Sequence, residues 1–196
     1  MPMMPLSKAC SYVTAKMDAT DSVLDSYVST ENLLSNKEGR RRASGTPVHG
    51  TVTSYSCGDI LISNIRPYFK KIWYADNEGT CSNDVLCVRA NDKKRSGLLF
   101  FALYADAFFA HVTQGSRGTK MPRGDKAQIM QYKICDIDSA IAQDEFNVLL
   151  KLVSNNNGQI VCLKNLRDAL LPKLMSGEID VSQVDLTQPN NHLQLG

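Results

Sequence analysis

Residues 58–73, GDILISNIRPYFKKIW, place short apolar segments on either side of a basic turn. The first apolar segment covers residues 60–62, and the second covers residues 72–74. Glycine, asparagine and proline around such segments are typical of turns that connect β-strands. We therefore predict two strands here, connected by the polar and basic residues 63–71.

Similar apolar segments recur through the first 137 residues. They comprise residues 12–13, 27–28, 85–88 and 128–134, and Gly, Asn, Asp and Pro separate them. Residues 98–112 are apolar over a longer stretch without glycine or proline, so we predict one helix packed on the sheet. Strands and helices in this mixture favour an α+β fold. The aromatic residues expected in its core are Trp73, Phe100, Phe101, Phe108 and Phe109.

The pattern changes after Asp138, where glycine and proline become rare. Apolar residues then recur at steps of three and four, which is the period of a coiled coil. We predict a helix over about residues 139–175, roughly 55 Å long at 1.5 Å per residue. An alternative is a turn at residues 155–158, NNNG, between two shorter helices. Gly177 would end the helix.

Three regions follow from this change of period. Residues 1–137 are predicted to form a globular domain, and residues 138–177 a long helix of coiled-coil type. Residues 178–196 are predicted to form a flexible tail, since they are rich in Gln and Asn.

A second basic segment covers residues 115–126, GSRGTKMPRGDK. Its glycines allow close backbone approach to a ligand, and its cations suit an extended polyanion, so nucleic acid is the first partner to consider. The alternative is an ordinary solvated loop. The candidate DNA-binding residues of the two basic segments are Asn64, Arg66, Lys70, Lys71, Arg117, Thr119, Lys120, Arg123 and Lys126. Most are expected to contact phosphate, with Asn64 and Thr119 as base readers.

Composition sets limits on this hypothesis. The chain has 196 residues, of which 43% are hydrophobic, and a net charge of +2, so DNA binding must depend on local clusters. Its six cysteines contain no C-x-x-C pair and are predicted to be reduced and buried. The N-terminus lacks the pattern of a secretion signal, and the longest apolar stretch is shorter than a membrane span. We expect a cytoplasmic protein.

No catalytic motif emerges from the sequence. The segment Asn64–Tyr68 lacks the first proline of an adenine methyltransferase motif, and no glycine-rich cofactor turn follows a strand. Residues 115–120 do not have the spacing of a phosphate-binding loop. Asp59, Asp84 and Asp92 could be nuclease metal ligands, but no Glu-x-Lys or Asp-x-Lys element follows them on a strand. Asp59 and Asp84 are interpreted as turn residues. We predict no metal site and no catalytic residue.

Several segments, in order, resemble the target recognition domain of type I restriction-modification specificity subunits. They are residues 27–34, YVSTENLL; 58–73; 81–86, CSNDVL; and 118–124, GTKMPRG. Residues 166–179, LRDALLPKLMSGEI, are similar to the end of the helical conserved region in these subunits. A complete subunit carries two domains and two helical regions, whereas this sequence has one of each.

The resemblance implies a small mixed-sheet domain that reads half of a split DNA site, followed by a helix that pairs antiparallel with its counterpart. It implies no catalytic activity and no cofactor of its own. Modification subunits would supply S-adenosylmethionine chemistry, and restriction subunits would use ATP and magnesium. The alternative is a small stand-alone nuclease or modification enzyme.

A half-subunit lacks a second helix, so we predict a homodimer. The residues predicted to pair are Leu149, Val153, Asn156, Ile160, Leu163, Leu170 and Leu174. The apolar seam runs from Phe146 to Leu174. The alternatives to a dimer are an amphipathic helix that folds back on its own domain, or one that waits for a modification subunit.

Overall fold

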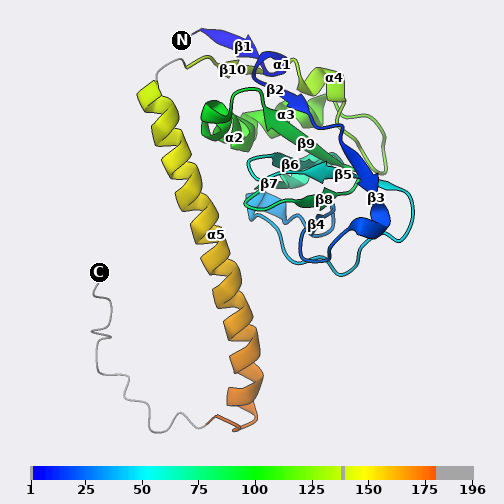
Figure 1. Cartoon of the computed structure of the whole chain (residues 1–196), viewed down its shortest axis with the longest axis vertical. Coiled ribbons are helices and arrows are strands. Elements are labelled where there is room, and N and C mark those ends of the chain that lie inside the picture. The colour runs from blue at the N-terminus through cyan, green and yellow to red at the C-terminus, as the bar shows by residue number, and fades with distance from the viewer. Residues whose placement is uncertain (1, 138–139, 180–196) are drawn as a thin grey trace. The chain divides into compact units, whose positions relative to one another are not determined.

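The computed structural model describes residues 2–137 and 140–179 (Figure 1). The chain divides into two compact units, Met1–Asn157 and Gly158–Gly196. The first unit contains the sheets and the first half of the last helix. The predicted tail lies outside the described residues from position 180 onward.

The central sheet has four antiparallel strands in the order β2-β9-β6-β7. Its strands are β2 (Cys10–Tyr12), β9 (Val85–Ala90), β6 (Ile60–Ser63) and β7 (Ile72–Tyr74). The strands β6, β7 and β9 lie at positions predicted from the sequence, whereas β2 overlaps the predicted residues 12–13 only at Tyr12. Residues 64–71, the rest of the first basic segment, connect β6 to β7, and within them Pro67–Phe69 form a 3₁₀ turn, η3.

A second four-stranded sheet has the order β3-β5-β8-β4. Its strands are β3 (Lys16–Asp18), β5 (Thr51–Tyr55), β8 (Gly79–Cys81) and β4 (Tyr27–Val28). The β4 and β8 strands run parallel, whereas the other pairs are antiparallel. A two-stranded sheet joins β1 (Met3–Pro5) to β10 (Lys133–Cys135), with α1 (Leu6–Ala9) after β1.

The central sheet is buried on both faces, which explains why its strands are apolar without alternation. One face carries Ile60, Ile62 and Leu86, which pack with helices α2 (Ser96–Tyr104) and α3 (Asp106–Gln114). The opposite face carries Leu61 and Trp73, which pack against the second sheet. The domain is therefore a layer of helices and two sheets stacked on each other (Figure 1).

The prediction of one helix over residues 98–112 is wrong. Two helices cover this region, α2 (Ser96–Tyr104) and α3 (Asp106–Gln114), and they are bent by 65°. Ala105 takes an extended backbone conformation between them. The bend lets apolar side chains of both helices reach the same core. Residues 128–134 are likewise only partly a strand, because α4 (Lys126–Ile129) precedes β10.

The predicted core aromatics are buried at four of five positions, and Phe101 is only partly buried. Tyr68 and Phe69 are exposed. The prediction that all cysteines are buried is wrong, because Cys57, Cys135 and Cys162 are exposed. These three lie on a turn, on the short strand β10 and on the last helix, where the layers do not cover them.

The last helix, α5 (Ala140–Met175), has 36 residues and runs through residues 155–158 without a break. The alternative of two shorter helices is therefore excluded. Pro172 lies inside the helix, and Gly177, with φ +76°, follows its end as predicted.

The first turns of α5 pack on the domain. Leu150 is buried in the core with α2, and the ring of Phe146 lies 5.9 Å from that of Phe101. The Asn147 side chain accepts a hydrogen bond from the Gly97 N–H and donates one to the Lys94 carbonyl. A Cβ atom at Gly97 would approach the Phe146 carbonyl oxygen to 2.7 Å. Glycine at this position therefore permits close contact between the two helices.

Candidate nucleic-acid interface

The two basic segments predicted from the sequence lie side by side. Ile65 and Arg123 form an antiparallel bridge, and the Arg66 N–H donates to the Pro122 carbonyl over 2.8 Å. The Gly124 N–H also donates to the Asn64 carbonyl. The segments are separated by about 50 positions in the sequence, so the fold brings them together.

The loop of residues 115–124 is closed like a small hairpin. Arg117 and Arg123 exchange two backbone hydrogen bonds, both 2.9 Å long. Gly118 turns the chain with φ +99°, and Gly124 has no room for a side chain between Val112 and Asn64. The side chains of Arg117, Thr119, Lys120, Arg123 and Lys126 are exposed. This loop therefore presents its cations outward from a fixed base.

Several of these cations already have acidic neighbours. Arg123 pairs with Asp84 over 2.9 Å, and Arg117 pairs with Asp125 over 3.1 Å. The Asp125 side chain also accepts the Gln128 and Ala127 N–H groups, which with Arg117 lower its pKa. Lys120 has no ion-pair partner among the described residues. The most available positive charge of the loop is therefore at its tip.

The cations of the other segment are held more tightly. Lys70 and Lys37 both contact one oxygen of Asp106, at 2.9 and 2.8 Å, and lower the pKa of Asp106 to about 2. The Lys71 ammonium donates to the Thr30 carbonyl, and its burial lowers its pKa. Lys70 and Lys71 therefore stabilise the turn through these contacts in addition to giving it positive charge.

Asn64 and Arg66 lie at the foot of the turn. Only 8% of Asn64 is exposed, and its Oδ1 atom has no hydrogen-bond partner among the described residues. The Arg66 Nε atom is also buried without a partner, although the residue is half-buried as a whole. Asn64 therefore lies behind the surface, and its role in base reading stays a prediction.

Lys16 is a basic residue at this surface that the sequence did not single out. Its ammonium contacts Thr53 and Asn83, and all three residues line a cavity of about 200 Å³ together with Tyr12 and Lys126. Lys16 is isolated in the sequence among non-basic residues, so its spacing gave no signal. Only the pairing of β3 with β5 places it beside the turn before β9.

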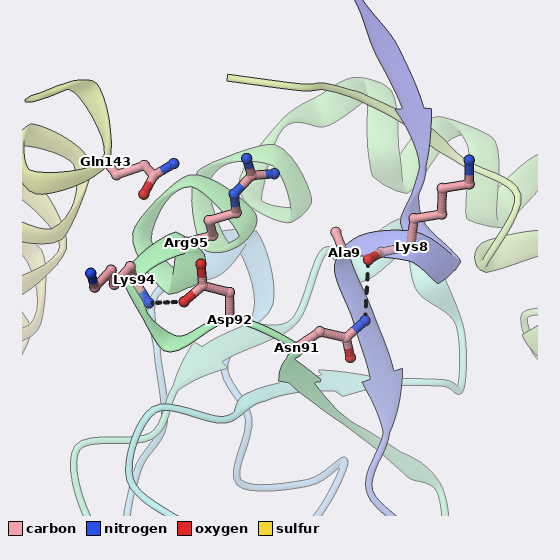
Figure 2. A pocket seen from close by; sticks show the side chains of 7 residues that line it. All are labelled: Lys8, Ala9, Asn91, Asp92, Lys94, Arg95 and Gln143. Carbon is pink, nitrogen blue, oxygen red and sulfur yellow. Dashed lines mark hydrogen bonds between the residues drawn. The ribbon is translucent and has the colours of Figure 1, made fainter. Parts of the chain in front are cut away.

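Another cavity, of about 440 Å³, lies at the other end of β9 (Figure 2). It is lined by Lys8, Asn91, Asp92, Lys94, Arg95 and Gln143, with Ala9. The Asn91 amide donates to the Lys8 carbonyl, and Asp92 accepts the Lys94 N–H. Arg95 pairs with Asp136. Several of the polar groups that line this cavity therefore make hydrogen bonds or ion pairs within the protein.

The acidic residues considered as metal ligands serve other purposes. Asp59 is buried, pairs with Arg89 through two 2.6 Å contacts and accepts the Ser56 N–H. Asp84 pairs with Arg123, and Asp92 caps a 3₁₀ turn. Within residues 2–137 and 140–179, no group of three or more His, Cys, Asp or Glu side chains is placed to hold a metal ion.

The predicted pairing residues of α5 are mostly exposed. Leu149, Asn156, Ile160, Leu163, Leu170 and Leu174 are exposed, and Val153 is half-buried. Phe146 packs on the domain and does not belong to this exposed set.

Among the described residues, no single helix is long and apolar enough to cross a membrane. The bent pair Lys93–Tyr104 and Asp106–Gln114 would be long and apolar enough if its two parts are counted together. Its apolar side chains are largely buried in the core of the domain.

Three solved structures share this fold. The chain aligns with the HsdS subunit from Thermoanaerobacter tengcongensis over 90% of its own length and 46% of that chain, with a TM-score of 0.55 and 18% identity. It aligns with the S subunit of the type I restriction-modification system from M. genitalium over 90% and 46%, with a TM-score of 0.57 and 13% identity. It also aligns with a chain from a structure on complex assembly and conformational transition of the type I R-M system. That alignment covers 94% of this chain and 51% of the other, with a TM-score of 0.58 and 18% identity.

The fold is that of half a type I specificity subunit. The α+β class and the fold implied by the sequence resemblance are therefore confirmed. The chain spans about half the length of the subunits that it matches. No family model matches the chain, and no curated protein sequence matches it.

Proposed function

We propose that this chain is a non-catalytic DNA-recognition subunit of a type I restriction-modification system, equivalent to half of a specificity subunit. The fold carries this proposal, because the likeness to such subunits extends over at least 90% of the chain. The domain reads one half of a bipartite site in double-stranded DNA.

The two basic segments, which are hydrogen-bonded to each other, form the surface at which we place the DNA. Arg117, Lys120, Arg123 and Lys126 are exposed on one loop, whose base is bonded to the turn that carries Arg66 and Lys70. Cations on such a surface bind phosphate and release counterions, so binding weakens as salt rises. Base contacts in the grooves then select the sequence.

The chain brings no cofactor of its own to the reaction. Modification subunits supply S-adenosylmethionine and methylate adenine, and restriction subunits use ATP and magnesium. The specificity subunit selects the site for both and holds them on the DNA.

A second copy of the chain supplies the other half of the recognition unit. The helix α5 has 36 residues and would be about 54 Å long at 1.5 Å per residue. Antiparallel pairing of two such helices through Leu149, Val153, Asn156, Ile160, Leu163, Leu170 and Leu174 gives two-fold symmetry. This length exceeds the roughly 34–36 Å of one DNA turn, so the two domains would reach separated half-sites of a palindromic target.

Selection from a random-sequence duplex library tests the proposal. We expect the purified chain to enrich a short sequence, and the Lys120→Ala, Arg123→Ala double variant to bind all sequences more weakly with a flatter salt dependence. Failure of the wild-type chain to bind duplex DNA would reject the proposal. DNA cleavage with magnesium, or methyl transfer from labelled S-adenosylmethionine, that survived repurification would instead favour an enzyme.

A further inference from the structure

Two aromatic side chains project from the turn between β6 and β7. Tyr68 is 49% exposed and Phe69 is 39% exposed, and their ring centroids lie 4.8 Å apart. Trp73, three positions after the turn, is by contrast buried between the sheets. A single exposed aromatic is common on protein surfaces, but a packed pair on one short turn calls for a reason.

The backbone of this turn is held in a costly conformation. Arg66 and Lys70, at its two ends, have φ values of +51° and +52°. The Phe69 N–H donates to the Arg66 carbonyl and the Lys70 N–H to the Pro67 carbonyl. Left-handed conformations of non-glycine residues persist only where the surroundings enforce them, and they are concentrated at functional sites.

A neighbouring turn enforces this conformation. The Lys37 N–H donates to the Lys70 carbonyl over 2.9 Å. Asn36 and Lys37 also have positive φ values, so within residues 2–137 and 140–179 every non-glycine residue of this kind belongs to these two turns. Tyr68 and Phe69 are therefore presented on a rigid support.

The surroundings of the pair indicate a polyanionic partner. Arg66, Lys70 and Lys71 flank the rings, and the Lys71 ammonium lies 5.9 Å from the Phe69 centroid. The loop with Lys120 and Arg123 is bonded to the foot of the same turn. The buried and unpaired Asn64 Oδ1 and Arg66 Nε atoms lie there too. Lys70 and Arg123 have acidic partners, but Lys71 and Lys120 have no ion-pair partner among the described residues, so a purely apolar protein partner would leave these two charges without counter-charges.

We propose that Tyr68 and Phe69 contact the bases of bound duplex DNA, while the cations around them bind its phosphates. The inference rests on the proposed function and adds an apolar contact to it. Aromatic rings contact thymine methyl groups in the major groove, or enter an opened base step from the minor groove. In both cases the partner is the apolar surface of a base.

A salt titration separates this contact from the electrostatic one. The probe is a mixed-sequence DNA duplex of roughly 40 base pairs. Binding is measured by fluorescence anisotropy from about 50 to about 300 mM salt, because phosphate contacts weaken over this range of salt concentration. We expect the Tyr68→Ala, Phe69→Ala double variant to bind at least about fivefold more weakly, with an unchanged slope of log Kd against log salt. Lys120→Ala, Arg123→Ala should instead reduce the slope.

Two controls accompany the double variant. Val48→Ala shortens an exposed apolar side chain outside both basic segments and should bind DNA as the wild type does. Thermal unfolding of the double variant should match the wild type, because both rings are largely outside the core. The same titration with deoxyuridine in place of thymidine identifies the contact. A loss seen for the wild type but not for the double variant assigns thymine methyl groups, and equal binding to both duplexes assigns the ring faces of an opened step.

The outcomes distinguish the two proposals. If the wild type binds DNA and the folded double variant binds within twofold of it, this inference is wrong and the proposed function stands. If the wild type does not bind duplex DNA, both are wrong.

Discussion

The sheet domain and the last helix both contain large apolar side chains, but those of the domain are buried and many of those on the helix are exposed. Phe108 is fully buried between the helices and the central sheet. Leu163 of α5 is 63% exposed, as are several of its apolar neighbours to a lesser degree. Burial of a leucine-sized side chain is worth about 1.5–3 kcal/mol, so an exposed apolar helix gains by pairing. The chain itself covers the apolar side chains of the sheet domain, whereas many of those on α5 are exposed, which is why we propose that α5 pairs with a second copy.

The largest effect should come from opening the core of the domain. Phe108→Ala removes a fully buried ring from the contact between α3 and the sheet. We expect the free energy of unfolding to fall by about 3–5 kcal/mol, measured by urea denaturation. Phe69→Ala makes the same change at an exposed ring and should change it by less than about 0.5 kcal/mol. Equal losses at the two sites would contradict the contrast between core and turn.

The next effect concerns assembly rather than folding. Leu163→Asp places a charge in the exposed apolar stripe of α5, and we expect it to convert a dimer into a monomer near 21.7 kDa. Sedimentation equilibrium at micromolar concentration measures this. Asn165→Asp introduces the same side chain on the opposite side of the helix and should leave the dimer intact. A wild-type chain that sediments as a monomer would reject the homodimer.

A smaller effect should appear where the helix meets the domain. Asn147 bonds the Gly97 N–H and the Lys94 carbonyl at the start of α2, so its side chain caps that helix from a distant part of the sequence. We expect Asn147→Ala to lower the free energy of unfolding by about 0.5–2 kcal/mol in urea denaturation. Asn155→Ala, at an exposed position of the same helix, should have almost no effect.

The comparison also explains what the sequence could predict. The strands at residues 60–62, 72–74 and 85–88 were predictable because a doubly covered sheet requires continuous apolar segments. The strands β5 and β8 were missed, since TVTSY and GTC contain few apolar residues. The break at Ala105 was missed because neither glycine nor proline marks it. Core packing imposed these features, and local propensity does not encode them.

The same limit applies to the candidate interface. The two basic segments were predictable from their cations and turn residues. The ion pairs Arg123–Asp84 and Lys70–Asp106 join positions that are 39 and 36 apart, so no local pattern contains them. The sequence therefore indicated which residues carry charge, but the fold determines which of these charges have acidic partners.

The smallest effect we predict concerns the carboxylate that Lys37 and Lys70 share. Because the two ammonium groups lower the pKa of Asp106 to about 2, from an ordinary value near 3.9, the ionised form stabilises the folded state. This contribution is fully present above about pH 4 and is lost as the pH falls toward 2. The wild type should therefore be slightly more stable than Asp106→Asn at pH 7, and the difference should shrink in that acid window. Because Asp106 is exposed, the difference will be small.

Urea denaturation of both proteins between pH 7 and about pH 2 measures this difference. Asp144→Asn removes an exposed carboxylate of α5 with no ion-pair partner among the described residues, and its difference from the wild type should not follow that window. At pH 7, Asp106→Asn also leaves Lys37 and Lys70 without their counter-charge beside the basic turn. It should then bind duplex DNA more tightly and with a steeper salt dependence, whereas Asp144→Asn should not. Unchanged binding by Asp106→Asn would place these lysines outside the DNA interface and confine their role to holding the turn.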